Sequence, residues 1–483
     1  MVIVAAAAGR VFDFTHLPDY GEGTVLAAVE RMQQEPLAPR WIEEPPYTLC
    51  PYGPVYYWAA SGATRLLGLE HTLVPGRLVS LAATLVTVGL LIWAVRRAAG
   101  SLAMGLVIAA LFLTTPVIRG WGVVYRVDAL ATLMALSAYL LAECGGRVRQ
   151  GDEAPAASAP AAWDWGLVGS AVCIAAGSLV KQTVALAALP IFLWLLVHQR
   201  RRAALGYAVL VAVLGIAGWW IVDRISGGYH LSCAVKGHMG HMSLAYGFWK
   251  GYDFLFIPLA SLGMASVLFL AVGRPWAVLR SLYTLGFLVS TAIATVLSGR
   301  QGSAACYFME ALCLAGLAAG AIALHALVRR HAGRAAWTAA LLSVLLALPE
   351  LQALRRQGRD WSIRPYASAL VEAKLHARPG DWVLADGQHL DAALRAGLTP
   401  ALNDSFFMRL SVEAQRMSPQ ALLDAMQDGR VGWLILRRPT EEHVAQVGTI
   451  SQKWPAEVAR AMQRLYEPVA NGEELFLYHR RQP

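Results

Sequence analysis

A succession of long apolar stretches between residues 78 and 349 constrains this chain more than any other feature. A helix needs roughly 20 apolar residues, and at least about 17, to cross the bilayer core. Ten segments approach that length: 78–95, 101–118, 127–143, 164–180, 182–198, 204–222, 252–272, 281–298, 307–327 and 335–349. Charged residues make up only 15% of the chain, against about 25% in soluble domains. The sequence therefore predicts an all-α polytopic membrane bundle of about ten transmembrane helices.

Arginines mark every second loop between these segments. They follow the first, third, fifth, seventh and ninth spans: Arg96, Arg97, Arg147, Arg149, Arg200, Arg201, Arg202, Arg274, Arg280, Arg329, Arg330 and Arg334. Basic residues favour cytoplasmic loops, so the other loops are expected outside the cytoplasm. The formal charge of +9 is explained better by this placement than by nucleic-acid binding, and no nucleic-acid partner is predicted.

Two domains are predicted. Residues 1–350 form the transmembrane domain, including a first outer loop at 10–77, and residues 351–483 form a small extracytoplasmic α/β domain. Within the second domain, strand-like and helix-like segments alternate, which is typical of that class. The predicted strands are 382–385, 431–436 and 474–479, and the predicted helices are 388–395, 419–427 and 456–466.

The start of the chain and its cysteines carry further expectations. Val2 to Ala8 is too short to span a bilayer and has no basic region before it, as a signal peptide would. We therefore expect either that a first helix is missing or that this segment only touches the membrane. The six cysteines contain no CxxC pair, and they predict neither a disulfide framework nor a zinc motif.

The first outer loop carries two acids, Asp19 and Glu22, at a predicted helix start. Acids at that position are favoured by the helix dipole and by capping, so a capping pair is the alternative to a chemical role. Tyr52 follows in an aromatic segment with Pro and Gly, at 46–58. Such a composition fits the membrane interface, where Tyr and Trp prefer to lie.

Further charged residues stand at the outer ends of the third and fourth spans. Arg126 and Asp128 precede the third span, where a local ion pair is the alternative to a site. Lys181 interrupts continuous apolar sequence, and a charge there is costly unless it faces a cavity or a partner. A lysine that snorkels to the interface is one interpretation, and an anion-binding role is the preferred one.

The loop before the ninth span is a second candidate anion site. Arg300 lies between glycines, and backbone N–H groups with a guanidinium can hold a phosphate there. A plain turn with an interfacial salt bridge is the alternative. Glu310 lies one turn inside the apolar helix that follows, so we expect it to have a partner.

The loop at 223–250 collects His230, Lys236, His238 and His241. Zinc needs a third and a fourth ligand in suitable geometry, and beside His238 and His241 only His230, Asp223 and Asp253 lie near in sequence. We therefore prefer a mobile loop on the acceptor or phosphate side. No cofactor is predicted, and a divalent metal is the less favoured alternative.

Four motifs give the chain a resemblance to a known superfamily. They are Asp19-Tyr20-Gly21-Glu22-Gly23, Tyr52-Gly53-Pro54-Val55-Tyr56-Tyr57, Arg126-Val127-Asp128-Ala129-Leu130 and Lys181-Gln182-Thr183, with the stretch Gly302-Ser303 to Tyr307-Phe308-Met309-Glu310 in support. In order and spacing they resemble the GT-C superfamily of membrane glycosyltransferases. Its members use polyprenyl-phosphate-linked sugars and include the protein O-mannosyltransferases and the lipid A aminoarabinose transferases.

The resemblance implies that a first-loop acid is the catalytic base, with Asp19 leading and Glu22 as the alternative. The chain departs from the family in that members begin with a full helix before this loop. The implied reaction is metal-independent, inverting sugar transfer from a polyprenyl-phosphate donor to a glycan, lipid or protein. It would take place at the outer face of a bacterial inner membrane, in contact with membrane lipids.

The leaving lipid phosphate needs cations in place, and four residues are assigned to it: Lys181, Arg126, Arg300 and Lys236. The other site candidates are Asp128, Tyr52, His230, His238, His241 and Glu310. Two alternatives stay open, an O-antigen ligase or polymerase and a transporter or flippase of lipid-linked sugars. Intramembrane charges also suit a transporter, but the charges here gather on one side and a folded outer domain follows.

Overall fold

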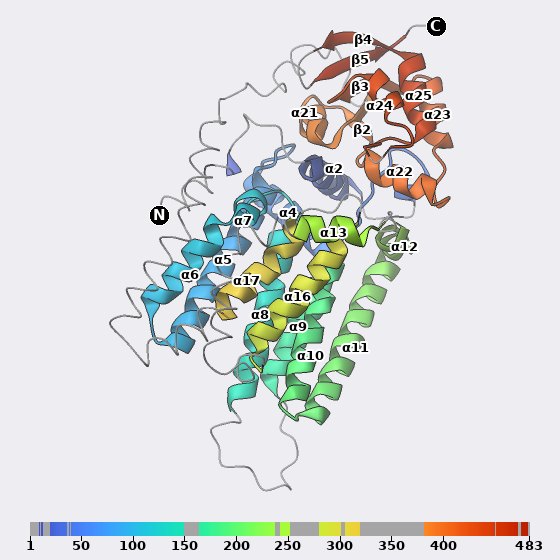
Figure 1. Cartoon of the computed structure of the whole chain (residues 1–483). Coiled ribbons are helices and arrows are strands. Elements are labelled where there is room, and N and C mark those ends of the chain that lie inside the picture. Colours follow the sequence, from blue (N-terminus) through green and yellow to red (C-terminus); the bar gives the residue numbers. More distant parts are fainter. Residues whose placement is uncertain are drawn as a thin grey trace.

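A computed structural model describes residues 9, 11–12, 20–35, 38, 40–148, 164–236, 242–251, 280–300, 305–318, 381–449, 451–471 and 475–481. A helical bundle forms one part, and a small domain with a sheet lies at one end of it (Figure 1). Asp19, His238 and His241 lie outside the described residues, as do the predicted spans at 252–272 and 335–349.

The bundle is built from apolar helices that meet the other eight predicted spans. Its elements are α5 (Val74–Ala99), α6 (Leu102–Thr114), α7 (Pro116–Trp121), α8 (Asp128–Val148), α9 (Trp165–Ser178), η1 (Gln182–Ala187), α10 (Ala188–Val197), α11 (Arg201–Ile225), α16 (Leu282–Ser298), η3 (Ala305–Phe308) and α17 (Met309–Ala318). By length and composition, three described helices could cross a membrane: Val74–Ala98, Asp128–Gly145 and Arg201–Ile225. Other described helices are apolar but shorter. The predicted class, a bundle of apolar helices, is therefore confirmed, while the number of spans stays a prediction.

The helix ends follow local chemistry. Helix α5 begins with a proline in its first turn and ends where Gly100 takes the left-handed conformation, at φ 69°, which glycine adopts without steric cost. Helix α9 is capped by the Asp164 carboxylate, which accepts from the Leu167 N–H. Helix α11 buries only Ala204, Tyr207 and Val222 and leaves many apolar side chains exposed, including Leu205, Val213 and Ile216. An apolar exterior of this kind suits a surface in contact with lipid.

The C-terminal domain is an α/β unit, as predicted. Its strands β1 (Trp382–Ala385), β2 (Thr399–Leu402), β3 (Val431–Leu436), β4 (Tyr466–Asn471) and β5 (Phe476–Arg480) pair in the order β2-β1-β3-β5-β4. The first three are parallel, and β5 is antiparallel to both β3 and β4. The helical elements are η5 (Gly387–His389), α21 (Leu390–Arg395), α22 (Ser405–Glu413), α23 (Gln420–Gln427), α24 (Thr440–Ala445) and α25 (Ala456–Leu465).

Strands β2 and β4 and helices α22 and α24 were not predicted. The two strands carry prolines, at Pro400 and Pro468, which weaken a strand signal in sequence because proline is confined to sheet edges. Both are edge strands here. The strands that had been predicted, β1, β3 and β5, are the buried central ones.

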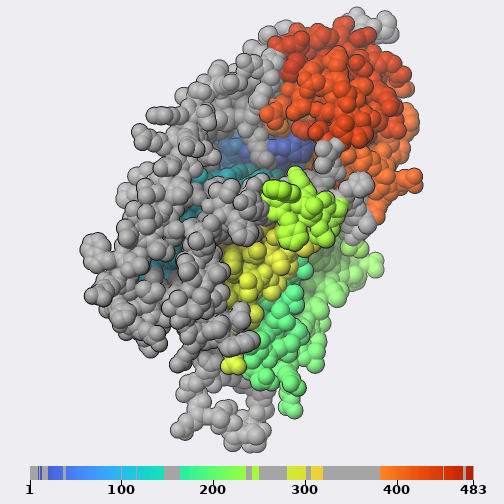
Figure 2. Space-filling model, viewed as in Figure 1, coloured from blue at the N-terminus to red at the C-terminus, as the bar shows by residue number. Residues whose placement is uncertain are grey.

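The first outer loop lies between the bundle and the C-terminal domain, as Figure 2 shows in dark blue. Its helices are α2 (Tyr20–Gln34), α3 (Arg40–Glu43) and α4 (Pro54–Leu67). Helix α2 approaches η5 so closely that a Cβ atom on Gly23 would lie within van der Waals overlap of the Gly387 carbonyl. At the other end of the loop, Tyr47 forms a parallel bridge to Leu402 on the edge strand β2. The described part of the predicted outer loop therefore packs on both the C-terminal domain and the bundle.

Helices α12 (Tyr229–Lys236) and α13 (Leu244–Gly251) form the described part of the loop that had been predicted as mobile. They lie at the end of the bundle that faces the C-terminal domain (Figure 1). Helix α13 packs on α16 through Gly247, where a Cβ atom would overlap the Thr295 carbonyl. Its side chains Tyr246, Phe248 and Trp249 are exposed, which is typical of a helix in the membrane interface.

Candidate functional site

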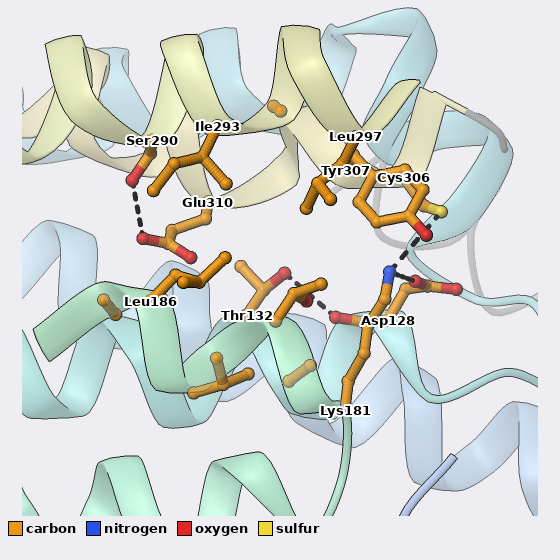
Figure 3. Close-up of a pocket in the computed structure, with 15 residues that line it drawn as sticks. Asp128, Thr132, Lys181, Leu186, Ser290, Ile293, Leu297, Cys306, Tyr307 and Glu310 are labelled. Atoms are coloured by element: carbon orange, nitrogen blue, oxygen red, sulfur yellow. Dashed lines mark hydrogen bonds and ion pairs between the residues drawn. The ribbon is translucent and has the colours of Figure 1, made fainter. Parts of the chain in front are cut away.

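A narrow crevice opens between two walls of the bundle (Figure 3). Helix α8, Lys181 and η1 form one wall, and α16, η3 and α17 form the other. The lining residues are Asp128, Ala131, Thr132, Lys181, Thr183, Val184, Leu186, Ala187, Ser290, Ile293, Ala294, Leu297, Cys306, Tyr307 and Glu310. Polar groups lie at the two ends, and aliphatic side chains lie between them.

An ion pair between Lys181 and Asp128 closes the outer end of the crevice. The Lys181 Nζ atom lies 2.7 Å from the Asp128 Oδ1 atom, and both residues are buried. The chain reverses at Lys181, between α9 and η1, so the ammonium group points back toward the start of α8. The snorkelling interpretation of Lys181 is therefore wrong, because its partner lies inside the protein.

Arg126 adds a second cation to the same carboxylate. Its Nε atom lies 3.4 Å from the Asp128 Oδ2 atom, and its Nη2 group donates to the Tyr52 hydroxyl at 3.2 Å. The guanidinium also stacks over the Trp121 ring, 4.9 Å from the centroid. The predicted local ion pair of Arg126 and Asp128 exists, and it belongs to a larger cluster.

Tyr52 and Tyr307 line the space between the cations. The Lys181 Nζ atom lies 4.1 Å from the Tyr307 ring centroid, within cation–π range. Burial raises the pKa of Tyr52 to about 12, although the Arg126 and Lys181 charges oppose that shift. Its hydroxyl therefore keeps its proton at neutral pH and can donate to an anion. Burial also lowers the pKa of Arg300, which lies close enough to Tyr307 and Tyr52 to interact with both electrostatically.

Backbone contacts hold the Tyr52 segment against the Lys181 turn. Gln182 donates from Nε2 to the Pro51 carbonyl at 2.6 Å, and the Val55 N–H donates to the Leu179 carbonyl at 3.2 Å. Gly53 lies so close to Leu179 that a Cβ atom would overlap its carbonyl. Glycine and proline at 51–54 are thus explained by a close backbone approach.

Glu310 lies at the opposite end of the crevice and has two neutral partners. Its Oε1 atom accepts from the Ser290 hydroxyl at 2.6 Å and from the Tyr139 hydroxyl at 2.9 Å. The expectation of a partner for Glu310 is confirmed. Figure 3 shows its side chain directed into the space between the two walls.

Glu22 lies elsewhere, in a bidentate ion pair. Its two carboxylate oxygens accept from Arg77 Nε and Nη2, each at 2.8 Å, and Oε1 also accepts from the Tyr125 N–H at 2.8 Å. Glu22 is 2% exposed and does not line the crevice. This contact set ties α2 to α5 and to the segment just before Arg126.

Of the histidine and lysine candidates in the 223–250 loop, His230 is placed by the structure. It is fully buried in α12, and its ring packs on Trp219 at 5.5 Å between centroids. Burial lowers the pKa of His230 to about 4, so it is neutral at physiological pH. Lys236 ends α12. Within the described residues, no three His, Cys, Asp or Glu side chains are grouped to hold a metal ion.

Two kinds of site residue escaped the sequence analysis. Tyr139 and Ser290 look like ordinary bundle residues, and only their hydrogen bonds to Glu310 single them out. Asn403, in the C-terminal domain, is not among the site candidates from the sequence, yet it docks the first outer loop. Its Oδ1 atom accepts from the Leu49 N–H at 2.7 Å, and its Nδ2 group donates to the Thr24 and Leu49 carbonyls, each at 3.2 Å.

The cluster therefore combines two cations that pair with one carboxylate, two tyrosines, and a third cation near those tyrosines. The cations Arg126, Lys181 and Arg300 come from three separate connections between helices. Such a set can receive an anion through charge and O–H donation, beside an apolar crevice that can accept part of a lipid chain.

Comparison with solved structures shows which fold this is. ArnT from Cupriavidus metallidurans, bound to undecaprenyl phosphate, matches with a TM-score of 0.61 at 16% identity, covering 99% of this chain and 97% of that chain. The Archaeoglobus fulgidus oligosaccharyltransferase in its apo form matches with a TM-score of 0.56 at 12% identity, covering 100% and 74%. The archaeal AglB, in complex with an inhibitory peptide and a dolichol-phosphate, matches with a TM-score of 0.50 at 12% identity.

No protein-family model matches the sequence, and no curated protein sequence matches it at a significant level. The resemblance inferred from the four motifs is confirmed at the level of the fold, because the matching structures belong to the superfamily that the motifs indicated.

Proposed function

Starting from the GT-C fold that this chain shares with those structures, we propose that it is a membrane glycosyltransferase with a lipid-linked donor. It transfers a sugar from a polyprenyl phosphate to a glycan, lipid or protein hydroxyl. The observation that carries this proposal is a cluster in which Lys181 and Arg126 pair with one carboxylate, Asp128. A third cation, Arg300, lies near Tyr52 and Tyr307 of the same cluster. The ArnT that matches this fold is bound to undecaprenyl phosphate.

The electrostatics favour an anionic leaving group at the outer end of the crevice. Asp128 neutralises one of the cations, so the cluster keeps an excess of positive charge that a phosphate can balance. Tyr52 and Tyr307 supply O–H donors beside it. The free volume of the crevice, about 40 Å³, holds only a few water molecules. We therefore place the phosphate at the mouth and the first part of the lipid between the two walls, after these walls separate.

Asp19 remains the leading base and Glu22 the alternative. In the proposed step, the base takes the proton of the acceptor hydroxyl as that oxygen attacks the anomeric carbon, and the carbon–phosphate oxygen bond breaks with inversion. The Glu22 contacts favour a supporting role, because both of its oxygens are occupied by Arg77.

The sidedness of the proposal rests on the arginines. Arg96, Arg97 and Arg200 end or begin helices at the end of the bundle remote from the C-terminal domain (Figure 1). Basic residues favour the cytoplasmic side. We therefore propose that the protein resides in a bacterial inner membrane. The cluster and the C-terminal domain then lie on the side of that membrane away from the cytoplasm.

The test offers purified protein in detergent a set of radiolabelled polyprenyl-phosphate sugars together with a membrane extract as the source of acceptor. We expect transfer of label by the wild type, no transfer by Asp19→Asn and none by Lys181→Met. Transfer by Asp19→Asn at the wild-type rate would overturn the assignment of the base. The flippase alternative would be favoured by two results together. The wild type would transfer no sugar from any lipid-linked donor, and protein reconstituted in vesicles would move a labelled lipid-linked sugar across the vesicle membrane.

A further inference from the structure

Two cysteines that are 183 residues apart meet beneath the first outer loop. The Cys50 N–H donates to the Cys233 Sγ atom at 3.1 Å. Both residues are buried, at 1% and 2% exposure, and both are free thiols in this structure. The sequence shows no sign of this pairing, because one cysteine precedes Tyr52 and the other lies in α12.

The separation suits a covalent bridge. The N–Cα bond adds about 1.46 Å, so the Cα atom of Cys50 lies within about 4.6 Å of the Cys233 sulfur. In a disulfide the Cα atom of one cysteine is three bonds from the sulfur of the other, so a change of the Cys50 side-chain rotamer would turn its sulfur toward that of Cys233. The Tyr229 hydroxyl interacts with both thiols and marks the space in which their sulfur atoms would meet.

The two cysteines join segments that already support the candidate site. Tyr229 donates its hydroxyl proton to the Thr48 carbonyl at 2.7 Å and accepts from the Cys50 N–H at 3.1 Å. Helix α12 therefore holds the segment that leads to Tyr52 and its hydrogen bond with Arg126. A covalent link at this point would fix the Tyr52 segment to α12.

We infer that Cys50 and Cys233 form a disulfide bond that clamps the first outer loop to α12 in an oxidising extracytoplasmic compartment. The inference takes the sidedness of this end of the bundle from the proposed function. The two thiols lose two electrons and two protons, and one S–S bond forms between them. The oxidant is an exchangeable disulfide of the thiol–disulfide oxidoreductase class, which is reduced to two thiols.

Burial of the two thiols determines at which stage of folding the disulfide can form. It raises the pKa of the Cys50 thiol to about 12 and also raises that of Cys233, so the thiolate that attacks a disulfide is rare in the closed structure. We therefore expect oxidation during folding, before α12 closes over the loop. Once formed, the buried bond should resist reductants until the protein opens.

The remaining cysteines offer a matched control. Cys173 is half-buried in α9, inside the apolar bundle. A Cys173→Ser variant keeps both partners of the inferred bond. Cys50→Ser and Cys233→Ser each remove one partner and leave the other thiol free.

The experiment counts oxidised cysteines in protein taken from cells. Free thiols are blocked with N-ethylmaleimide in denaturant at lysis, the protein is then reduced, and a mass tag labels the newly exposed thiols. We expect two tags on wild type and on Cys173→Ser, and none on Cys50→Ser or Cys233→Ser. Digestion without reduction should yield one peptide pair that links residues 50 and 233.

No tag on the wild type, or two tags on Cys50→Ser, would overturn the inference. In the oxidised protein we also expect an unfolding midpoint about 5 °C or more above that of the reduced protein, since the bond closes a long loop. Because the tag count does not depend on sugar transfer, a failure of the inferred bond and a failure of the proposed enzyme activity are distinguishable.

Discussion

The Nζ atom of Lys181 lies 2.7 Å from the Oδ1 atom of Asp128, and the two charges are buried together where two helix connections meet. Taking two charges out of water costs several kcal/mol each, so the pair persists only because each ion has other partners. Arg126 and Tyr307 supply them. A buried pair with a further cation beside it is consistent with the anion site proposed above.

Single and double substitutions of Lys181 and Asp128 distinguish a role in stability from a role in sugar transfer. Lys181→Met leaves Asp128 buried beside Arg126 alone, and we expect a loss of roughly 3–5 kcal/mol in unfolding free energy with transfer reduced at least about 100-fold. The double variant Lys181→Met/Asp128→Asn removes both charges and should recover most of the stability. Its transfer should stay low, as measured by label release from the lipid donor. Recovery of transfer with stability would show that Lys181 has only a structural role.

Arg300 is predicted to bind the donor phosphate without taking part in the chemical step. Arg300→Gln should raise the KM for the lipid donor about tenfold, which is the loss of one charge-assisted contact of about 1.4 kcal/mol, with little change in kcat. Arg280→Gln is the matched control, because Arg280 is exposed at the other end of α16. Equal effects of both substitutions on KM would contradict the assignment.

Glu22 is predicted to be a structural anchor. Glu22→Gln should lower the unfolding midpoint, because Arg77 loses its bidentate partner inside the protein. The double variant Glu22→Gln/Arg77→Met removes the unpaired charge, and the glutamine oxygen can still accept from the Tyr125 N–H. We expect both stability and transfer to return. A double variant that is stable but inactive would instead identify Glu22 as a reacting group.

His230 gives the protein a specific acid sensitivity. Its folded pKa of about 4 lies below the ordinary value near 6.5, so the unfolded state binds more protons between these two values. The stability contributed by neutral His230 is therefore complete above pH 6.5 and is lost as the pH falls through this window, by about 2 kcal/mol at pH 5. His230→Gln should flatten the fall in unfolding midpoint between pH 7.5 and pH 5. An unchanged slope would show that other groups dominate.

Asn403 is predicted to position the first outer loop. Asn403→Ala leaves the Leu49 N–H and two carbonyls without their partner, and each buried unsatisfied group costs about 1–3 kcal/mol. We expect a lower unfolding midpoint and a fall in kcat, measured in the same transfer assay. Asn471→Ala, at the exposed end of β4, is the control and should change neither. Wild-type kcat in Asn403→Ala would show that docking through this residue is dispensable for transfer.

The membrane class and the outline of the bundle were predicted from sequence because both depend on local composition. An apolar stretch such as 204–222, which forms most of α11, is expected to be helical because no water is available to its backbone in lipid. Its N–H and C=O groups must therefore bond to one another. The central strands β1 and β3 were predicted for a similar reason, because their continuous apolar runs are local. The edge strand β2 was missed because Pro400 weakens its strand signal, and its bridge to Tyr47 comes from a segment more than 350 positions away.

The sequence by itself determined that Lys181 and Glu310 needed partners, because a polar group in apolar surroundings carries a large desolvation cost. The tertiary structure alone decided which partners they have: Asp128 for Lys181, and Ser290 with Tyr139 for Glu310. It also placed Glu22 on Arg77 and Cys50 against Cys233. The desolvation cost of a polar side chain depends on that residue and on its neighbours in sequence. The identity of its partner depends on how helices that are distant in sequence pack together, and no local sequence pattern encodes this packing.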